Sequence, residues 1–330
     1  MLHRIFVACL TGFLILPTVS AEDSDRTESD ADTNEALWIT SIAPLGDDFV
    51  AGRASGLLLR PGAVMKFSLA DVSEGKFEQL YEHPAAVWCI DSTTDGKTIA
   101  SVDYKGNLGV YRTADGSATM HEGAFERWCQ SLVVAPDDQS VVAGNEAGKL
   151  MVWSLSEAKV SKSIEVSKAS ITCLAFSPAA SLLAAADGAG VVHLFSWPAL
   201  EAQGSIKISE ETAWSVAFEN DTMLVAGAAD RTIYRAEAKD QATPEKLAEG
   251  SDWITRLAVS PGGSIAAAEV SGKIHFASGG DHSSLEADSG VWALCFAGSG
   301  QVLVGTRKDG IQIAGQAWSW RDDGAAGESP

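Results

Sequence analysis

The chain has 330 residues, 46% of them hydrophobic and 21% charged, and its formal net charge is −20 at pH 7. This acidic surplus argues against nucleic acid as a partner, because phosphates attract dense lysine and arginine. It equally disfavours binding to anionic membranes. The length could hold two domains, but internal repeats along the chain indicate one large domain.

Residues 1–21 have the pattern of a secretory signal peptide, with Arg4 ahead of the apolar stretch 5–16. Val19, Ser20 and Ala21 fit the small-x-small cleavage rule, which would leave Glu22 at the mature N-terminus. The apolar stretch is too short to cross a bilayer of roughly 30 Å as a helix, so we expect no membrane insertion. We expect export, to either a periplasmic or an extracellular location.

The segment 22–36 follows, with seven acidic residues, one arginine and almost nothing apolar. This composition predicts a disordered spacer. We expect a single folded domain over 37–320 and a disordered C-terminal tail over 321–330.

One pattern recurs through the folded region. An apolar anchor residue near the end of a short strand is followed by a polar turn, a small apolar run and a second turn. Repeats of about 40 residues made of short strands are typical of propeller blades. The seven anchors are Ile42, Ile90, Leu132, Leu174, Val216, Leu257 and Leu294.

The fourth repeat shows the unit most clearly, with strands predicted over 171–176, 182–186 and 191–195. Ser177-Pro178 ends the first strand and a glycine-rich turn precedes the third. Three or four such strands cannot bury both sheet faces alone. We therefore predict an all-β fold, a seven-bladed β-propeller of four-stranded antiparallel blades.

The first and last repeats depart from this unit. Repeat one is the longest, and we place its insertion at 60–63, within the third strand. In repeat seven the residues 316–320 could form the fourth strand. The spacer is too acidic for a good closing strand, so we predict that the ring closes without one from the N-terminus.

The repeats resemble the WD40 family. The resemblance rests on the segment 87–90 followed by Asp95-Gly96, and on the segment 175–178 followed by 193–195. His83 stands at the family's strand-leading histidine position, and Asp230 and Asp309 at its tight-turn aspartate position. No repeat holds both residues, so we expect the blades to depend on packing more than on buried polar networks.

Tryptophan is concentrated in the first strand of each repeat. Those that lie two residues before their anchors are Trp88, Trp214 and Trp292, and those that lie four before are Trp38, Trp128 and Trp253. Both offsets have the same parity, which points them to one side of their strands. The WD40 resemblance implies that they lie around the central channel, where family members commonly contact partners. The indoles could pack between blades or form an aromatic ring that recognises a protein or peptide.

Catalysis at the channel mouth would need converging carboxylates or histidines. The equivalent positions instead hold Trp, Ser, Thr and the arginines Arg127 and Arg256, which we group with the tryptophans as candidate partner-binding residues. We therefore expect a monomeric, non-catalytic scaffold for a protein or peptide, without a cofactor. The alternatives are a carbohydrate-binding propeller, with indoles stacked on sugars, and a propeller hydrolase or lactonase. An enzyme would use channel-mouth carboxylates from among Asp103, Glu146, Asp187, Asp230, Glu269 and Asp309.

The mature chain would keep four cysteines, each on the innermost strand of a different repeat. A disulfide needs Cα atoms within about 7 Å, which leaves Cys89 and Cys129 in adjacent repeats as the plausible pair. Buried free thiols are the alternative that we favour. Without a C-x-x-C motif or clustered histidines, we expect no metal site.

Overall fold

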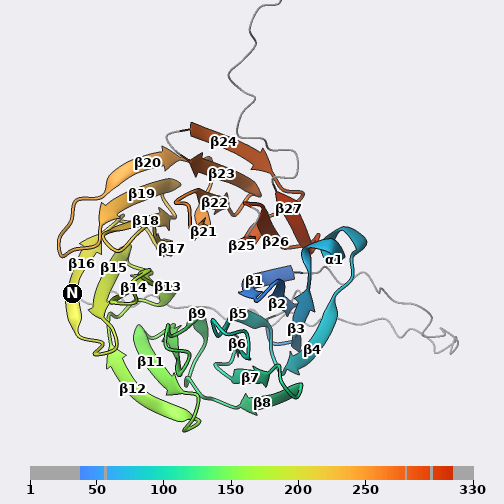
Figure 1. Cartoon of the computed structure of the whole chain (residues 1–330). Coiled ribbons are helices and arrows are strands. Elements are labelled where there is room, and N and C mark those ends of the chain that lie inside the picture. The colour runs from blue at the N-terminus through green and yellow to red at the C-terminus, as the bar shows by residue number, and fades with distance from the viewer. Residues whose placement is uncertain (1–37, 56–57, 279–280, 298–299, 315–330) are drawn as a thin grey trace, which may run out of the picture. The chain divides into compact units, whose positions relative to one another are not determined.

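A computed structural model describes residues 38–55, 58–278, 281–297 and 300–314. Its strands form seven separate sheets arranged in a ring (Figure 1). The strands of blades 1 and 2 are β1 (Trp38–Leu45), β2 (Asp48–Ala54), β3 (Gly62–Phe67), β4 (Glu78–His83), β5 (Val87–Ser92), β6 (Thr98–Asp103), β7 (Leu108–Arg112) and β8 (Ser117–His121). Those of blades 3 and 4 are β9 (Cys129–Val134), β10 (Ser140–Asn145), β11 (Lys149–Ser154), β12 (Lys159–Glu165), β13 (Ile171–Phe176), β14 (Leu182–Asp187), β15 (Val191–Ser196) and β16 (Ala202–Lys207). Those of blades 5 to 7 are β17 (Ala213–Phe218), β18 (Met223–Ala228), β19 (Thr232–Glu237), β20 (Glu245–Glu249), β21 (Ile254–Val259), β22 (Ile265–Glu269), β23 (Lys273–Ser278), β24 (Asp281–Glu286), β25 (Val291–Phe296), β26 (Val302–Thr306) and β27 (Ile311–Ala314).

Each sheet is an antiparallel meander in which the strands pair in chain order. Blades 1 to 6 have four strands, and blade 7 has three within the described residues. The prediction of a seven-bladed, all-β propeller is confirmed. The expected signal peptide, acidic spacer, last strand over 316–320 and C-terminal tail lie outside the described residues, as does any pairing of the N-terminal spacer.

The second strand of each blade is the most deeply buried, because both of its faces are covered by neighbouring blades. In β14 the run from Leu183 to Asp187 is almost fully buried. The turn that follows needs glycine: Gly190 has φ +77°, and a Cβ there would lie 2.1 Å from the carbonyl oxygen of Ser209. This is why a small apolar run followed by a glycine marks most repeats, whereas blade 5 has Arg231 there, with φ +70°.

Apolar clusters lie between blades and join them into a ring. Between blades 3 and 4, for example, Val142 and Leu150 pack with Ile171 and Leu183. Burying a side chain of this size contributes roughly 1.5–3 kcal/mol. The first and last blades meet in the same way, through a cluster in which Phe67 of blade 1 packs with residues of β25 and β26.

The length of blade 1 has a different origin from the predicted one. Strand β3 begins at Gly62, so Arg60 and Pro61 lie in the loop before it and not inside the third strand. Further length comes from α1 (Leu69–Glu74), which lies between β3 and β4. Ser68 caps this helix reciprocally with Asp71, an arrangement that stabilises a helix start. It is six residues long, and no helix in the described part of the chain is long and apolar enough to span a membrane.

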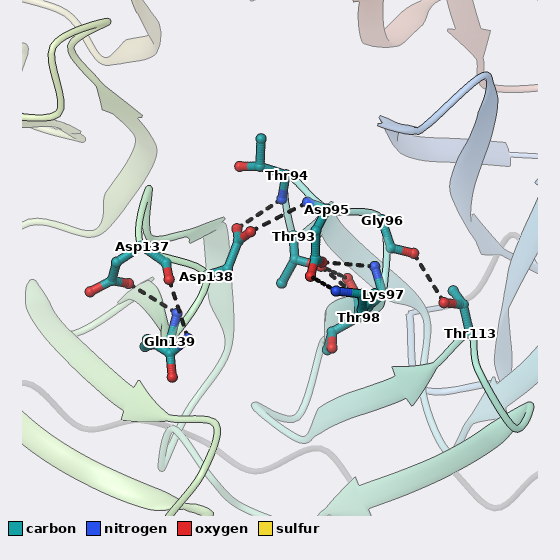
Figure 2. A network of polar contacts seen from close by, with 10 residues as sticks. All are labelled: Thr93, Thr94, Asp95, Gly96, Lys97, Thr98, Thr113, Asp137, Asp138 and Gln139. Carbon is teal, nitrogen blue, oxygen red and sulfur yellow. Dashed lines mark hydrogen bonds and ion pairs between the residues drawn. The ribbon is translucent and has the colours of Figure 1, made fainter.

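Polar contacts also join the turns between the first and second strands of neighbouring blades. Figure 2 shows the junction of blades 2 and 3, where the carboxylate of Asp138 accepts from the backbone N–H of Thr94 at 2.8 Å and of Asp95 at 3.3 Å. Asp138 has φ +57°, a left-handed conformation that aspartate tolerates. Blades 4 and 5 are joined similarly, because Asp221 accepts from the N–H of Ala179 at 2.6 Å.

Besides packing, a buried polar network that the sequence comparison did not predict joins blades 1 and 2. Nδ1 of the buried His83, on β4 of blade 1, lies 3.4 Å from Asp103 on β6 of blade 2, and its Nε2 lies 2.6 Å from the hydroxyl of Ser101. The Ser101 hydroxyl also bonds to Tyr81, at 2.8 Å. The acidic partner of His83 is thus Asp103, the last residue of the second strand of blade 2. It is not an aspartate at the family's tight-turn position.

Candidate binding face

The inner strands of all blades begin at the same end of the ring. In blades 2 to 7, the residue just after the second strand donates a backbone hydrogen bond to the residue that precedes the first strand, as in Glu146 to Trp128 (2.9 Å) and Val270 to Trp253 (3.0 Å). The six tryptophans therefore lie at this end, opposite the turns of Figure 2. We call their side chains the Trp face, which consists of Trp38, Trp88, Trp128, Trp214, Trp253 and Trp292.

Four of these indoles come together from blades 7, 1, 2 and 3. Trp38 lies 5.8 Å from Trp88 and 5.5 Å from Trp292, measured between ring centroids, and Trp88 lies 6.0 Å from Trp292. Trp128 joins through Trp88 at 5.1 Å. All these contacts are edge-to-face, the favourable geometry for aromatic pairs. Trp38 and Trp88 are buried, so this part of the Trp face contributes to the core.

The other two indoles form a separate pair on blades 5 and 6. Trp214 and Trp253 are stacked, with centroids 6.0 Å apart and an interplanar angle of 25°. Trp253 is 48% exposed, and within the described residues only Leu59 is a more exposed large hydrophobic side chain. Blade 4, which has Ser170 and Thr172 at the equivalent positions, lies between Trp214 and Trp128 of the cluster of four. The Trp face therefore has a buried part and an accessible part.

Unpaired donors are frequent at this end of the ring. The indole N–H groups of Trp38, Trp128, Trp214 and Trp292 are buried and have no hydrogen-bond partner among the described residues. A buried donor without an acceptor costs about 1–3 kcal/mol. An acceptor brought by a ligand would remove this cost wherever it could reach one of these groups.

The two candidate arginines occupy different surroundings. Arg127 is exposed and lies 3.3 Å from the carboxylate of Glu146. Arg256 is partly buried and donates to the carbonyl of Thr255 at 2.9 Å. Burial lowers the pKa of Arg256, and the thiol of Cys173 acts in the opposite direction. Arg127 therefore lies on the accessible surface, whereas Arg256 lies partly buried among the inner strands.

Sequence reasoning missed two residues of the Trp face. The guanidinium of Arg307 lies 5.4 Å from the ring centre of Trp38, within the range of a cation–π interaction. The ring of Tyr104 lies 4.7 Å from that of Trp128. Both residues directly follow the second strand of their blade. An alignment of the repeats at that position could have identified both residues from the sequence.

The carboxylates considered for catalysis are engaged by side chains of their own or the preceding blade, or are exposed. Asp103, Asp187 and Glu269 are buried and accept from His83, His193 and His275, at 3.4, 3.0 and 2.6 Å respectively. Asp230 accepts from Tyr234 at 2.7 Å, Glu146 pairs with Arg127, and Asp309 is exposed. The hydrolase alternative therefore gains no converging carboxylates from this set.

These hydrogen bonds also shift the pKa values of the buried carboxylates. Burial acts to raise the pKa of Asp103, but hydrogen bonds from His83 and Asn107 outweigh it and lower that pKa. Glu269 behaves in the same way, with Ser251 and His275 as the donors. These carboxylates are therefore held in the ionised form that the networks require.

The four cysteines Cys89, Cys129, Cys173 and Cys295 are free thiols on inner strands. Burial raises the pKa of Cys295 to about 12, which leaves its thiol unreactive. Among the described residues, no group of three or more His, Cys, Asp or Glu side chains is placed to hold a metal ion.

Seven meandering sheets that close on one another through apolar clusters define the chain as a β-propeller. A family model described as "WD domain, G-beta repeat" matches residues 159–196, which span β12 to β15. The chain is thus a WD40-like propeller, as its repeats predict. A comparison with curated proteins gives no match.

Proposed function

We propose that the chain is an exported, monomeric and non-catalytic scaffold that binds a protein or peptide through the Trp face. One observation carries the proposal: Trp253 is 48% exposed while stacked on Trp214, at the end of the ring where the inner strands begin. Packing alone would bury both rings. Tryptophan is enriched among residues that dominate binding energy at interfaces, because it offers a large rigid surface.

The buried and accessible parts of the Trp face have different roles in this proposal. The cluster of Trp38, Trp88, Trp128 and Trp292 holds blades 7, 1, 2 and 3 together at the mouth of the ring. The pair of Trp214 and Trp253 contacts the partner. The exposed Arg127 and Arg307 add positive charge to this end of a strongly acidic chain, which favours a partner segment that carries carboxylates.

A selection from a displayed peptide library against the folded chain tests the proposal. We expect Trp253→Ala to weaken the selected peptides by about 30-fold, as for a hot-spot tryptophan. Leu59→Ala, which removes the other exposed large hydrophobic side chain, is the matched control and should leave affinity unchanged. Peptides that bind both variants equally would contradict the proposal.

Carbohydrate is a second candidate ligand, because a flat and exposed indole such as Trp253 can stack on a sugar ring. A glycan array separates the two functions. Glycan binding that disappears in Trp253→Ala, together with the absence of any peptide ligand, would favour the carbohydrate-binding function.

Export rests on residues 1–21 alone, with their apolar stretch and small-x-small site. Mass spectrometry of the protein from its own cells should give Glu22 as the first residue, in a periplasmic or extracellular fraction. An intact N-terminus in the cytosolic fraction would contradict export.

A further inference from the structure

A cavity of about 320 Å³ lies between blades 5 and 6, away from the Trp face. Strands β19 and β20 of blade 5 form one wall, and strands β22, β23 and β24 of blade 6 form the other. Most of the lining is apolar and includes Ile233, Leu247, Ile265, Phe276 and Ala277. This size and character are typical of small-molecule sites.

The cavity has a specific origin in the third strand of the blades. One position there, fixed by pairing with the second strand, holds Phe67, Tyr111, Trp153 and Phe195 in blades 1 to 4, and Ala236, Ala277 and Ala314 in blades 5 to 7. In blades 1 to 4 this aromatic side chain packs against the preceding blade. Trp153, for example, packs against Phe125, with 6.1 Å between the ring centroids. Ala277 of blade 6 leaves the corresponding space unfilled.

The other two alanines lie in apolar clusters. Ala236 is buried in a cluster where Ile206, Ile208 and Phe218 fill the junction of blades 4 and 5. Ala314 packs in a cluster with Phe276. The junction of blades 5 and 6 has only a small apolar cluster, centred on Ile233 and Ile254. Apolar side chains therefore fill this junction less than the junctions of blades 4 and 5 and of blades 6 and 7.

Polar groups line one part of the cavity. The hydroxyl oxygen of Ser283 is buried and has no hydrogen-bond partner among the described residues. His275 also lines the cavity, and its Nε2 is held by Glu269 at 2.6 Å. An unpaired buried hydroxyl is costly, and a ligand that pairs with it would recover that cost.

We propose that this cavity binds a small, neutral aromatic molecule that carries one hydrogen-bonding group. The aromatic shape follows from the space, which corresponds to that of a ring in four other blades and is bordered by Phe276. The polar group would pair with Ser283. Neutrality follows from two features: Glu249 also lines the cavity, so a carboxylate ligand would be repelled, and the mostly apolar lining would not repay the desolvation of a cation. An apolar cavity of only about 150 Å³ already binds benzene, so the volume is sufficient for a substituted ring.

p-Cresol and toluene are a matched pair of probes, because they differ only by the hydroxyl. We expect p-cresol to bind the full chain saturably in calorimetric titration, and toluene to bind about tenfold more weakly, as expected for one lost hydrogen bond. Ser283→Ala should reduce p-cresol to the affinity of toluene. Trp253→Ala should change neither, because the cavity is separate from the Trp face.

Filling the cavity is the decisive test. Ala277→Phe should abolish binding of both probes and raise the midpoint of thermal unfolding, whereas Ala236→Phe, at the filled junction of blades 4 and 5, should lower it. If Ala277→Phe does not fold, Ala277→Leu provides the binding test. Absence of saturable p-cresol binding to the wild-type chain, or binding that survives the filling substitution, would overturn the proposal.

Discussion

Replacing Asp103 by alanine should destabilise the propeller strongly, because this carboxylate supports the buried network between blades 1 and 2. It accepts from the backbone N–H and the side-chain amide of Asn107, at 3.0 and 2.8 Å, and from Nδ1 of His83, at 3.4 Å. Asp103, Asn107 and His83 are all buried, so the donors left behind would not be fully solvated. Three buried donors, near the lower end of about 1–3 kcal/mol each, give an expected loss of about 4 kcal/mol.

Urea unfolding of Asp103→Ala, followed by circular dichroism, measures this loss as a lower midpoint with an unchanged slope. Glu146→Ala is the matched control, because Glu146 is 40% exposed and its pairing with Arg127 is a surface ion pair worth about 0–1 kcal/mol. Because the pKa of Asp103 is lowered in the fold, its stabilising effect is present above pH 4 and lost as the pH falls below that value. A loss below 1 kcal/mol at pH 7 would refute the argument that the network stabilises the blade.

Three further changes test other parts of the fold. Burial raises the pKa of Asp91 from 3.8 to about 6, so ionisation of this carboxyl destabilises the fold as the pH rises from 4 towards 7. Asp91→Asn removes this pH dependence, but it keeps only one of the two oxygens that accept from the backbone N–H groups of Ser92 and Val134. Between pH 4 and pH 7 the wild type should therefore lose up to about 3 kcal/mol relative to Asp91→Asn, and an equal pH dependence of the two would contradict this. Asp138→Ala should lower the midpoint of urea unfolding by the equivalent of about 1 kcal/mol, and Asp138→Asn, which keeps one acceptor, by less; equal effects would argue against the turn contact. Trp38→Ala should cost about 3–5 kcal/mol in the same assay, since Trp38 is buried against two other indoles, and a cost below 1 kcal/mol would place it outside the core.

Local signals were sufficient to predict the blades. Strand β13 spans the predicted residues 171–176, because proline ends it and a buried apolar run follows. Each blade is built from contacts between neighbours in sequence, so the periodicity of the repeats carries the fold. The insertion in blade 1 was misplaced because helix α1 is short and its residues 69–74 give little periodic signal.

The candidate site was predicted less completely, because it depends on distances between blades. The two tryptophan offsets do reach the same end of the ring, but a bulge in the inner strands makes simple parity unreliable: the register shifts around Trp88, Trp214 and Trp292. The division into a buried cluster and an exposed pair depends on how the rings are oriented and how far apart they lie, and the sequence offsets do not contain it. The partner of His83 was missed for the same reason, since Asp103 of blade 2 meets His83 of blade 1 across the junction between the two blades.

The two roles assigned to the Trp face can be separated by measuring stability and affinity side by side on Trp253→Ala and Trp38→Ala, with a peptide selected against the wild-type chain. The account predicts that Trp253→Ala lowers affinity about 30-fold while its free energy of unfolding stays within about 1 kcal/mol of wild type. Trp38→Ala should instead lose several kcal/mol of stability. Unchanged affinity in Trp253→Ala, or a loss of stability as large as that of Trp38→Ala, would show that the exposed pair is part of the core and not a binding surface.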